Sequence, residues 1–330
     1  MTARRAIRPV PATRRGWEPA APGAARSSPT GPAGSGSGPG PGAAEGAPVS
    51  PGGGARALSR GGPLGASTVS RSSLVSAHQV RRAVREPTTR IAFLHGLREN
   101  IQCWDRVVAL LPDDVDAWVL GLPWDGAHGD EWALERAPGV WVERALALLP
   151  ARSAAPTLLV AHSFGANVLL DHLDTGRVPD RLGLVLLAPF FRPTREAFDW
   201  PLITYYLNDF HLFLAGGITA RRTRPLDPEL LTGMSEKVRD RIGPYGWLRF
   251  FELFSRTPLL DLARLTVPCV VAGGEHDNAS FPADCLALAA ALPDARAEIL
   301  PGCGHHLMLE APRRVAELIR QLKERRCAAA

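Results

Sequence analysis

Residues 161–165 read Ala-His-Ser-Phe-Gly, a pentapeptide that sits between two apolar segments. Residues 157–161 form a short apolar run, and residues 166–173 have the apolar spacing of a helix. The pattern predicts a buried strand that turns sharply into a helix around Ser163. The small residues at positions 161 and 165 let the strand and the helix pass close to one another.

Apolar strands alternate with helices on both sides of this turn. Short apolar runs predict strands at residues 90–95, 117–120, 157–161, 183–188, 269–272 and 297–300. Helical spacing predicts helices at residues 104–111, 139–149, 166–173, 283–292 and 313–325. Such alternation indicates an α/β fold with a doubly wound, mostly parallel sheet. A ligand site is then expected at the carboxyl ends of the strands.

Two segments interrupt this alternation. Residues 190–257 show no clear strand and hold all three tyrosines, which predicts a helical lid over the strand ends. Residues 1–88 are rich in Arg, Gly, Pro and Ala, and such a segment cannot bury enough apolar surface to order itself. We therefore predict a disordered tail at residues 1–88, with a weak helix around residues 75–84, and one domain at residues 89–330.

Charge and cysteine content exclude several classes of protein. The net charge is +5, but residues 1–90 contain no Lys and only three acidic residues, so the basic charge lies in the tail. The predicted domain then offers no basic face to a nucleic acid. Five cysteines at irregular spacings match no metal or disulfide pattern and predict free thiols in the cytoplasm. We expect no cofactor, and no apolar run is long enough to span a membrane.

A serine at such a turn can act as a nucleophile when a base accepts its proton and an acid orients the base. Asp277 follows the fifth predicted strand and His305 follows the sixth, so both reach the sheet edge where Ser163 lies. The order Ser, Asp, His fits a catalytic triad on this fold. Glu275 is an alternative acid, and a serine that only caps the helix is the non-catalytic alternative.

Further motifs extend this pattern. They are Gly302-Cys303-Gly304-His305 followed by Glu310 and Pro312, His95-Gly96 after the first strand, and Trp104 in the next helix. With the pentapeptide, they make residues 90–329 resemble the α/β-hydrolase superfamily. The resemblance implies that His305, not its neighbour His306, is the base, and it favours Asp277 as the acid. Ala161 stands where the family has glycine and still keeps the site small.

Acyl chemistry also needs backbone N–H groups that stabilise negative charge on the carbonyl oxygen. Phe164 follows the serine and supplies one, and the resemblance implies that Leu97 supplies the other. We expect four further residues at the substrate pocket, namely Trp124, His95, Arg98 and His162. Arg98 is a candidate partner for a substrate carboxylate or a solvated charge, whereas His162 is assigned packing and no chemistry.

The triad and the resemblance predict a serine hydrolase that acts on an ester, thioester or related acyl substrate through an acyl-enzyme. The aromatic residues of the predicted lid favour a small-molecule substrate with an apolar acyl chain or ring. The same triad also serves acyltransferases, eliminating enzymes and C–C hydrolases, for example in small-molecule biosynthesis, and these remain alternatives. A non-catalytic ligand binder on the same fold is a third hypothesis.

Overall fold

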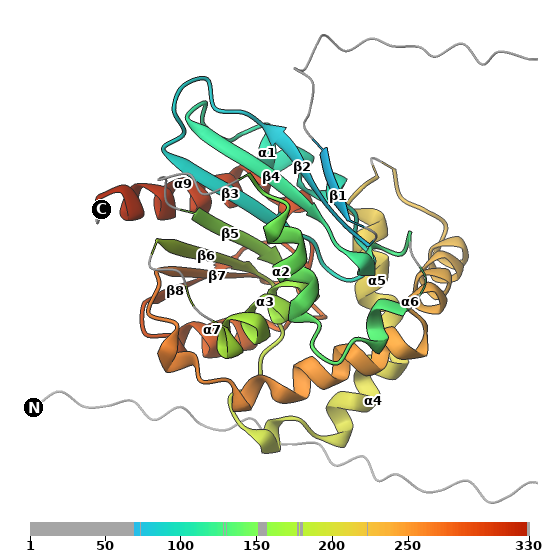
Figure 1. The fold of residues 1–330 in the computed structure, drawn as a ribbon. Helices are drawn as coiled ribbons and strands as arrows, with labels where there is room; N and C mark the ends of the chain where they lie inside the picture. Colours follow the sequence, from blue (N-terminus) through green and yellow to red (C-terminus); the bar gives the residue numbers. More distant parts are fainter. Residues whose placement is uncertain are drawn as a thin grey trace, which may run out of the picture. The chain divides into compact units, whose positions relative to one another are not determined.

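The structure is a computed structural model (Figure 1) that describes residues 69–72, 74–127, 129, 131–150, 157–176, 178, 181–222 and 224–328. Residues 1–68, which make up most of the predicted tail, lie outside the described residues. Within the described ranges, one sheet is covered by helices on both faces (Figure 1).

The sheet contains eight strands among the described residues, in the order β1-β2-β4-β3-β5-β6-β7-β8. Their bounds are β1 Val69–Ser72, β2 Val75–Arg81, β3 Thr89–Leu94, β4 Val115–Gly121, β5 Thr157–His162, β6 Leu182–Leu187, β7 Cys269–Gly274 and β8 Ala295–Leu300. Strands β3 to β8 are parallel, and β2 pairs antiparallel with both β1 and β4. All six predicted strands are present, and the doubly wound, mostly parallel sheet is confirmed.

The N-terminal edge of the sheet corrects two predictions. The helix predicted at residues 75–84 is wrong, because β2 occupies Val75–Arg81. The predicted tail of residues 1–88 is therefore too long at its C-terminal end. Buried and partly buried side chains alternate at the start of β2: Val75 and Ala77 are buried, and Ser76 and His78 are partly buried. This alternation is short, and pairing with β4 holds the segment extended where local propensity gives little signal.

Two layers of helices cover the two faces of the sheet (Figure 1). Helices α2 (Gly139–Ala147), α3 (Phe164–Thr175) and α7 (Pro282–Ala291) share one hydrophobic core. Helices α1 (Asp105–Val108), α8 (Leu307–Glu310) and α9 (Pro312–Ala328) belong to the other face. Successive residues of a strand point to opposite faces, so strand side chains alternate between the two cores. In β3, Ile91 and Phe93 belong to one core, and Ala92 and Leu94 belong to the other.

A helical insertion between β6 and β7 contains α4 (Trp200–Asn208), α5 (Phe210–Thr219) and α6 (Pro228–Arg256). Helix α6 bends at Gly243, whose φ of 68° is left-handed, and Pro244 follows it. Residues on both sides of the bend, Ile242 and Trp247, line one cavity with Ser163. The helical character predicted for residues 190–257 is thus present, and a role as a lid stays a prediction.

Short 3₁₀ helices complete the described chain. They are η1 (Ile101–Trp104), η2 (Pro123–Asp125), η3 (Glu131–Leu134), η4 (Arg195–Ala197), η5 (Thr257–Leu259) and η6 (Leu262–Arg264). Of the helices in the described ranges, none is both long and apolar enough to cross a membrane.

Candidate active site

Ser163 occupies the tight turn between β5 and α3. Its backbone has φ 53° and ψ −128°, a strained conformation for a residue with a side chain. The Ser163 N–H donates to the Leu187 carbonyl of the neighbouring strand (2.8 Å), and the Ser163 carbonyl accepts from the Ala166 N–H (2.9 Å). A Cβ at Gly165 would lie 2.4 Å from the His95 carbonyl oxygen, so only glycine fits there. The turn therefore holds the serine where strand and helix meet.

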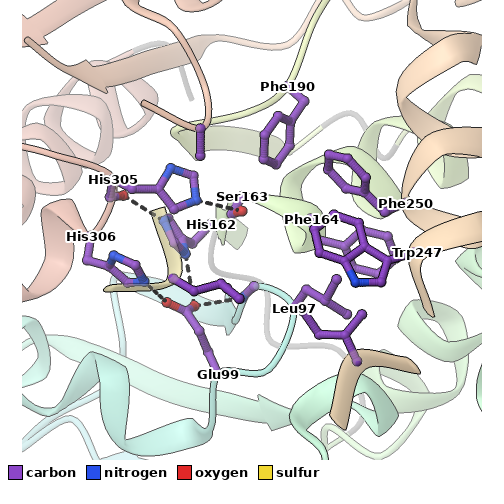
Figure 2. Close-up of a pocket in the computed structure, with 14 residues that line it drawn as sticks. Leu97, Glu99, His162, Ser163, Phe164, Phe190, Trp247, Phe250, His305 and His306 are labelled. Atoms are coloured by element: carbon purple, nitrogen blue, oxygen red, sulfur yellow. Dashed lines mark hydrogen bonds and ion pairs between the residues drawn. The ribbon is translucent and has the colours of Figure 1, made fainter. Parts of the chain in front are cut away.

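Ser163, His305 and Asp277 form one chain of hydrogen bonds. The Nε2 atom of His305 lies 2.9 Å from Ser163 Oγ, and its Nδ1 atom lies 2.8 Å from Asp277 Oδ2. A dashed line in Figure 2 marks the hydrogen bond between His305 and Ser163. The other oxygen of Asp277 accepts from the backbone N–H groups of Ala279 (2.7 Å) and Ser280 (2.9 Å). Loops after β5, β7 and β8 thus bring together the three residues that the sequence singles out.

These hydrogen bonds set the proton position on His305. A carboxylate only accepts, so Nδ1 carries the proton and Nε2 is left to accept the proton of the Ser163 hydroxyl. Burial disfavours the charged imidazole, but the Asp277 carboxylate outweighs burial and raises the pKa of His305 above its ordinary value. The neutral, oriented ring can act as a base toward Ser163.

If His305 is the base, activity should rise with pH through the raised pKa of this residue. Below that pKa the imidazolium has no lone pair for the Ser163 proton, whereas above it the neutral ring predominates. A pH profile of kcat/KM should therefore show an acid limb whose midpoint lies above 6.5, the ordinary value for histidine. An acid limb centred well below that value, in a pH range where the protein stays folded, would contradict the assignment.

Glu275, the alternative acid, lies apart from His305. Its side chain is exposed, and its Oε2 accepts from the backbone N–H of Gly302 (2.9 Å). Among the hydrogen bonds between described residues, none joins Glu275 to His305. The geometry therefore favours Asp277 as the acid.

Leu97 and Phe164, the expected oxyanion residues, border the same cavity as Ser163. In the described part of the chain, neither backbone N–H donates to a protein acceptor. Phe164 opens α3, and the first N–H groups of a helix lack intrahelical partners and form its electropositive end. Both N–H groups thus lack a protein acceptor among the described residues, and their role in binding an oxyanion stays a prediction.

His95, an expected pocket residue, does not line the cavity. Its ring is fully buried within its own loop. Nδ1 donates to the Gly96 carbonyl (2.9 Å), and Nε2 accepts from the Leu122 N–H (3.1 Å). Both ring nitrogens are thus used to join the loop after β3 to the loop after β4.

Trp124 and Arg98, also expected at the pocket, do not line the cavity either. The fully buried Trp124 donates its indole N–H to the His95 carbonyl (3.1 Å) and packs edge-on against Phe164. The Arg98 guanidinium packs over Gly126, where a Cβ would lie only 1.4 Å from its Nη1. Of the four expected pocket residues, only His162 lines the cavity.

A cavity of about 60 Å³ adjoins Ser163 (Figure 2). Its apolar wall is formed by Leu97, Phe164, Phe190, Leu214, Ile242, Trp247, Phe250 and Ala279. Figure 2 shows Phe190, Phe250 and Trp247 on one side of Ser163, and Glu99 and His306 on the other. Helices α5 and α6 of the insertion supply half of this apolar wall. The nucleophile candidate lies between an apolar side and a polar one.

The polar side is a buried cluster that the sequence analysis missed. Glu99, only 4% exposed, accepts from the Gly96 N–H with Oε2 (2.8 Å), and the same oxygen lies 2.8 Å from His162 Nδ1. Its Oε1 lies 3.3 Å from His306 Nε2. His162 was expected only to pack, but it also makes a hydrogen bond with Glu99. An acidic residue three positions after Gly96 was the only signal in the sequence for this cluster, and it matches no motif.

No described group of His, Cys, Asp and Glu side chains is suited to a metal ion.

A family profile and several solved structures match this chain. The profile described as "Alpha/beta hydrolase family" matches residues 91–318. The peroxisomal alpha-beta-hydrolase Lpx1 from Saccharomyces cerevisiae is similar in fold, with a TM-score of 0.55 and 16% identity over 80% of this chain and 89% of that one. No curated protein matches the sequence.

Two bacterial structures are also similar. The esterase RhEst1 from Rhodococcus sp. ECU1013 has a TM-score of 0.51 and 19% identity over 76% of this chain and 94% of that one. The serine hydrolase CCSP0084 from Cycloclasticus zankles has a TM-score of 0.51 and 18% identity over 78% of this chain and 98% of that one. At such identities the likeness shows the fold alone.

Proposed function

This chain belongs to the alpha/beta hydrolase family, and from that premise we propose that it is a serine hydrolase acting on an ester, thioester or related acyl substrate. The observation that carries the proposal is the unbroken hydrogen-bond chain from Asp277 through His305 to Ser163, beside an apolar cavity. A serine hydroxyl paired with a neutral, oriented imidazole is what nucleophilic acyl chemistry requires.

The proposed reaction passes through an acyl-enzyme. Ser163 Oγ attacks the acyl carbon while His305 Nε2 accepts the hydroxyl proton, and Asp277 stabilises the resulting imidazolium. The N–H groups of Leu97 and Phe164 bind the oxyanion, each contributing about 3 kcal/mol. His305 then gives its proton to the leaving group, and the Ser163 ester remains. Water loses a proton to the same imidazole, attacks this ester, and releases the carboxylic acid and free serine.

The cavity favours a short, apolar acyl group. Its volume of about 60 Å³ is well below the roughly 300–1,000 Å³ of pockets that take drug-sized ligands. Its wall consists of aromatic and aliphatic side chains, so burial of an apolar acyl chain there is favourable. We propose that the acyl part of the substrate is short and that the leaving group extends toward solvent.

Acyl-chain preference should change when the cavity is enlarged. The wild type should cleave aryl esters of short acids best, and Trp247→Ala should raise kcat/KM for longer acyl esters by about 10-fold or more. Trp247 is partly buried and lines the cavity, whereas Trp200 in the same insertion is 78% exposed and does not line it. Trp200→Ala is therefore the matched control. The same change in both variants would contradict the assignment of the acyl site.

Covalent labelling with a fluorophosphonate tests the proposed function directly. The probe should modify the wild type at Ser163, detected by mass spectrometry of the tryptic peptide, and should not modify Ser163→Ala. Labelling that persists in the variant, or a folded wild type that does not react, would overturn the assignment.

Acyl transfer to another acceptor is the second candidate, and one observation favours it. A wider hollow of about 320 Å³ borders His305 and is lined by polar groups that include Thr219, Asn278 and Glu310. An alcohol or amine held there would lie near the base. Product analysis with added alcohol acceptors separates the candidates, because transfer yields a new ester while hydrolysis yields the acid alone.

A further inference from the structure

We propose that Tyr205 and Tyr206 of α4 are positioning residues that hold the loop after β7 in the conformation that aligns Asp277 with the base. The inference rests on the proposed function, because the alignment of Asp277 matters to the reaction only if His305 acts as that base. The two tyrosines act through the backbone of residues 278–280 and take no share in bond making.

Each tyrosine hydroxyl binds one backbone carbonyl of this loop. The Tyr205 hydroxyl donates to the Asn278 carbonyl (2.6 Å), and the Tyr206 hydroxyl donates to the Ala279 carbonyl. A carbonyl oxygen only accepts, so the tyrosine is the donor in both hydrogen bonds. Two consecutive residues of the insertion thus bind two consecutive residues of the segment between β7 and α7.

The same two peptide groups also bind Asp277. The Asn278 carbonyl and the Ala279 N–H belong to one planar peptide group, and the Ala279 carbonyl and the Ser280 N–H belong to the next. The two N–H groups donate to Asp277 Oδ1, at 2.7 Å and 2.9 Å. Each peptide group is therefore held by a tyrosine hydroxyl at its carbonyl and by the Asp277 carboxylate at its N–H.

This arrangement orients and strengthens the two donors to Asp277. The C=O and N–H bonds of a trans peptide group point in opposite directions in one plane, so a partner that fixes the carbonyl also fixes the N–H. A hydrogen bond accepted by the carbonyl also polarises the peptide group and strengthens the bond that its N–H donates. With Oδ1 of Asp277 held in this way, Oδ2 is directed at His305 Nδ1 (2.8 Å). The tyrosines thus set the direction from which the acid meets the base.

Burial makes Tyr206 the more important of the two tyrosines. Tyr206 and Ala279 are both 0% exposed, whereas Tyr205 is partly buried and Asn278 is exposed. Water can replace a hydroxyl at the exposed Asn278 carbonyl, but loss of the Tyr206 hydroxyl would take a donor from a buried carbonyl, which is costly. Burial also raises the pKa of Tyr206 well above its ordinary value, so its hydroxyl keeps the proton that it donates.

Neighbouring aromatic side chains fix the ring of Tyr206. It packs edge-on against Phe190, Phe250 and Phe254, with ring centroids 5.9, 5.4 and 5.6 Å away. Phe190 and Phe250 also line the cavity beside Ser163. Tyr206→Phe keeps these ring contacts, and with them the cavity wall, and removes only the hydroxyl.

Steady-state kinetics of full-length Tyr206→Phe with an activated ester are the first test. We expect kcat to fall about 10-fold while KM stays nearly unchanged, because the cavity keeps its wall and only the alignment of Asp277 is lost. The rate of fluorophosphonate labelling at Ser163 should fall by a similar factor. Tyr245→Phe is the matched control, because it removes a hydroxyl from a tyrosine of the same insertion that is 50% exposed, and it should change neither rate. A wild-type kcat in Tyr206→Phe overturns the proposal.

A double-mutant cycle is the second test, and it asks whether Tyr206 acts through Asp277. Asp277→Ala leaves no carboxylate to align, so adding Tyr206→Phe to it should change the residual kcat by less than about twofold. Kinetics are measured at a temperature at which thermal unfolding shows every variant to be folded. A further loss of about 10-fold in the double variant overturns the positioning role, because the tyrosine would then act independently of Asp277.

The two proposals fail in different ways. A folded wild type that does not label at Ser163 refutes the serine hydrolase. A wild type that labels normally, with a Tyr206→Phe variant equal to it in kcat and labelling rate, refutes the positioning role alone. If Tyr206→Phe does not fold, Tyr205→Phe decides, because the partly buried Tyr205 holds the other peptide group. It should lower kcat about 3-fold, and an unchanged kcat overturns the proposal.

Discussion

Asp277→Asn should lower kcat about 10⁴-fold. Two backbone N–H groups, from Ala279 and Ser280, donate to Oδ1, so an asparagine would keep its carbonyl oxygen there. Its NH₂ group would then face His305 Nδ1, and an amide NH₂ only donates. His305 would have to place its proton on Nε2, where it could no longer accept one from Ser163.

Steady-state kinetics with an activated ester measure this effect. Glu275→Gln is the control, since Glu275 was the competing acid and its exposed carboxylate accepts from the Gly302 N–H and lies 3.8 Å from His276 Nε2 rather than beside His305. It should stay within about twofold of wild-type kcat. A larger loss in Glu275→Gln than in Asp277→Asn would reassign the acid.

Deletion of residues 1–88 should destabilise the domain by about 3 kcal/mol or more, whereas deletion of residues 1–68 should leave its stability unchanged. The longer deletion removes β2, with its backbone pairing to β4 and the buried side chains of Val75 and Ala77. Burial of a valine side chain alone is worth roughly 1.5–3 kcal/mol. The longer deletion also uncovers one edge of β4, whose Trp118 is only 1% exposed in the intact structure.

Thermal unfolding of the two truncated proteins distinguishes these outcomes. For a domain of this size, a loss of about 3 kcal/mol lowers Tm by about 6–12 °C. The shorter deletion is the control, because residues 1–68 are rich in Arg, Gly, Pro and Ala, a composition that predicts too little buried apolar surface to order the segment. Equal Tm values for both truncated proteins would show that β2 contributes nothing to the sheet.

Local patterns account for what could be predicted from the sequence. The strand, turn and helix around Ser163 are contiguous, so composition and spacing reveal them. Asp277 and His305 follow apolar strands in the order that this fold requires, and parallel strands end at one edge. Chain order therefore indicated which distant residues meet.

Contacts between distant segments account for what could not be predicted. The ring of His95 is oriented by the Leu122 N–H, and Trp124 is turned inward by the His95 carbonyl. Glu99 and His162 are 63 positions apart, and no sequence pattern around either residue predicts contact with the other. Strand β2 likewise depends on β4 as its partner, and its own alternation is too short to exclude a helix.

The shared core of the insertion and the sheet limits how substrate preference could evolve. Phe250 and Phe254 of α6 belong to the same buried cluster as the strands. Truncating such an aromatic residue costs about 3–5 kcal/mol, a large part of the roughly 5–15 kcal/mol that holds a typical protein folded. Partly buried wall residues such as Trp247 and Leu214 can change at lower cost. Natural variation in acyl preference should therefore begin at these marginal positions and reach the inner aromatic residues only with compensating changes.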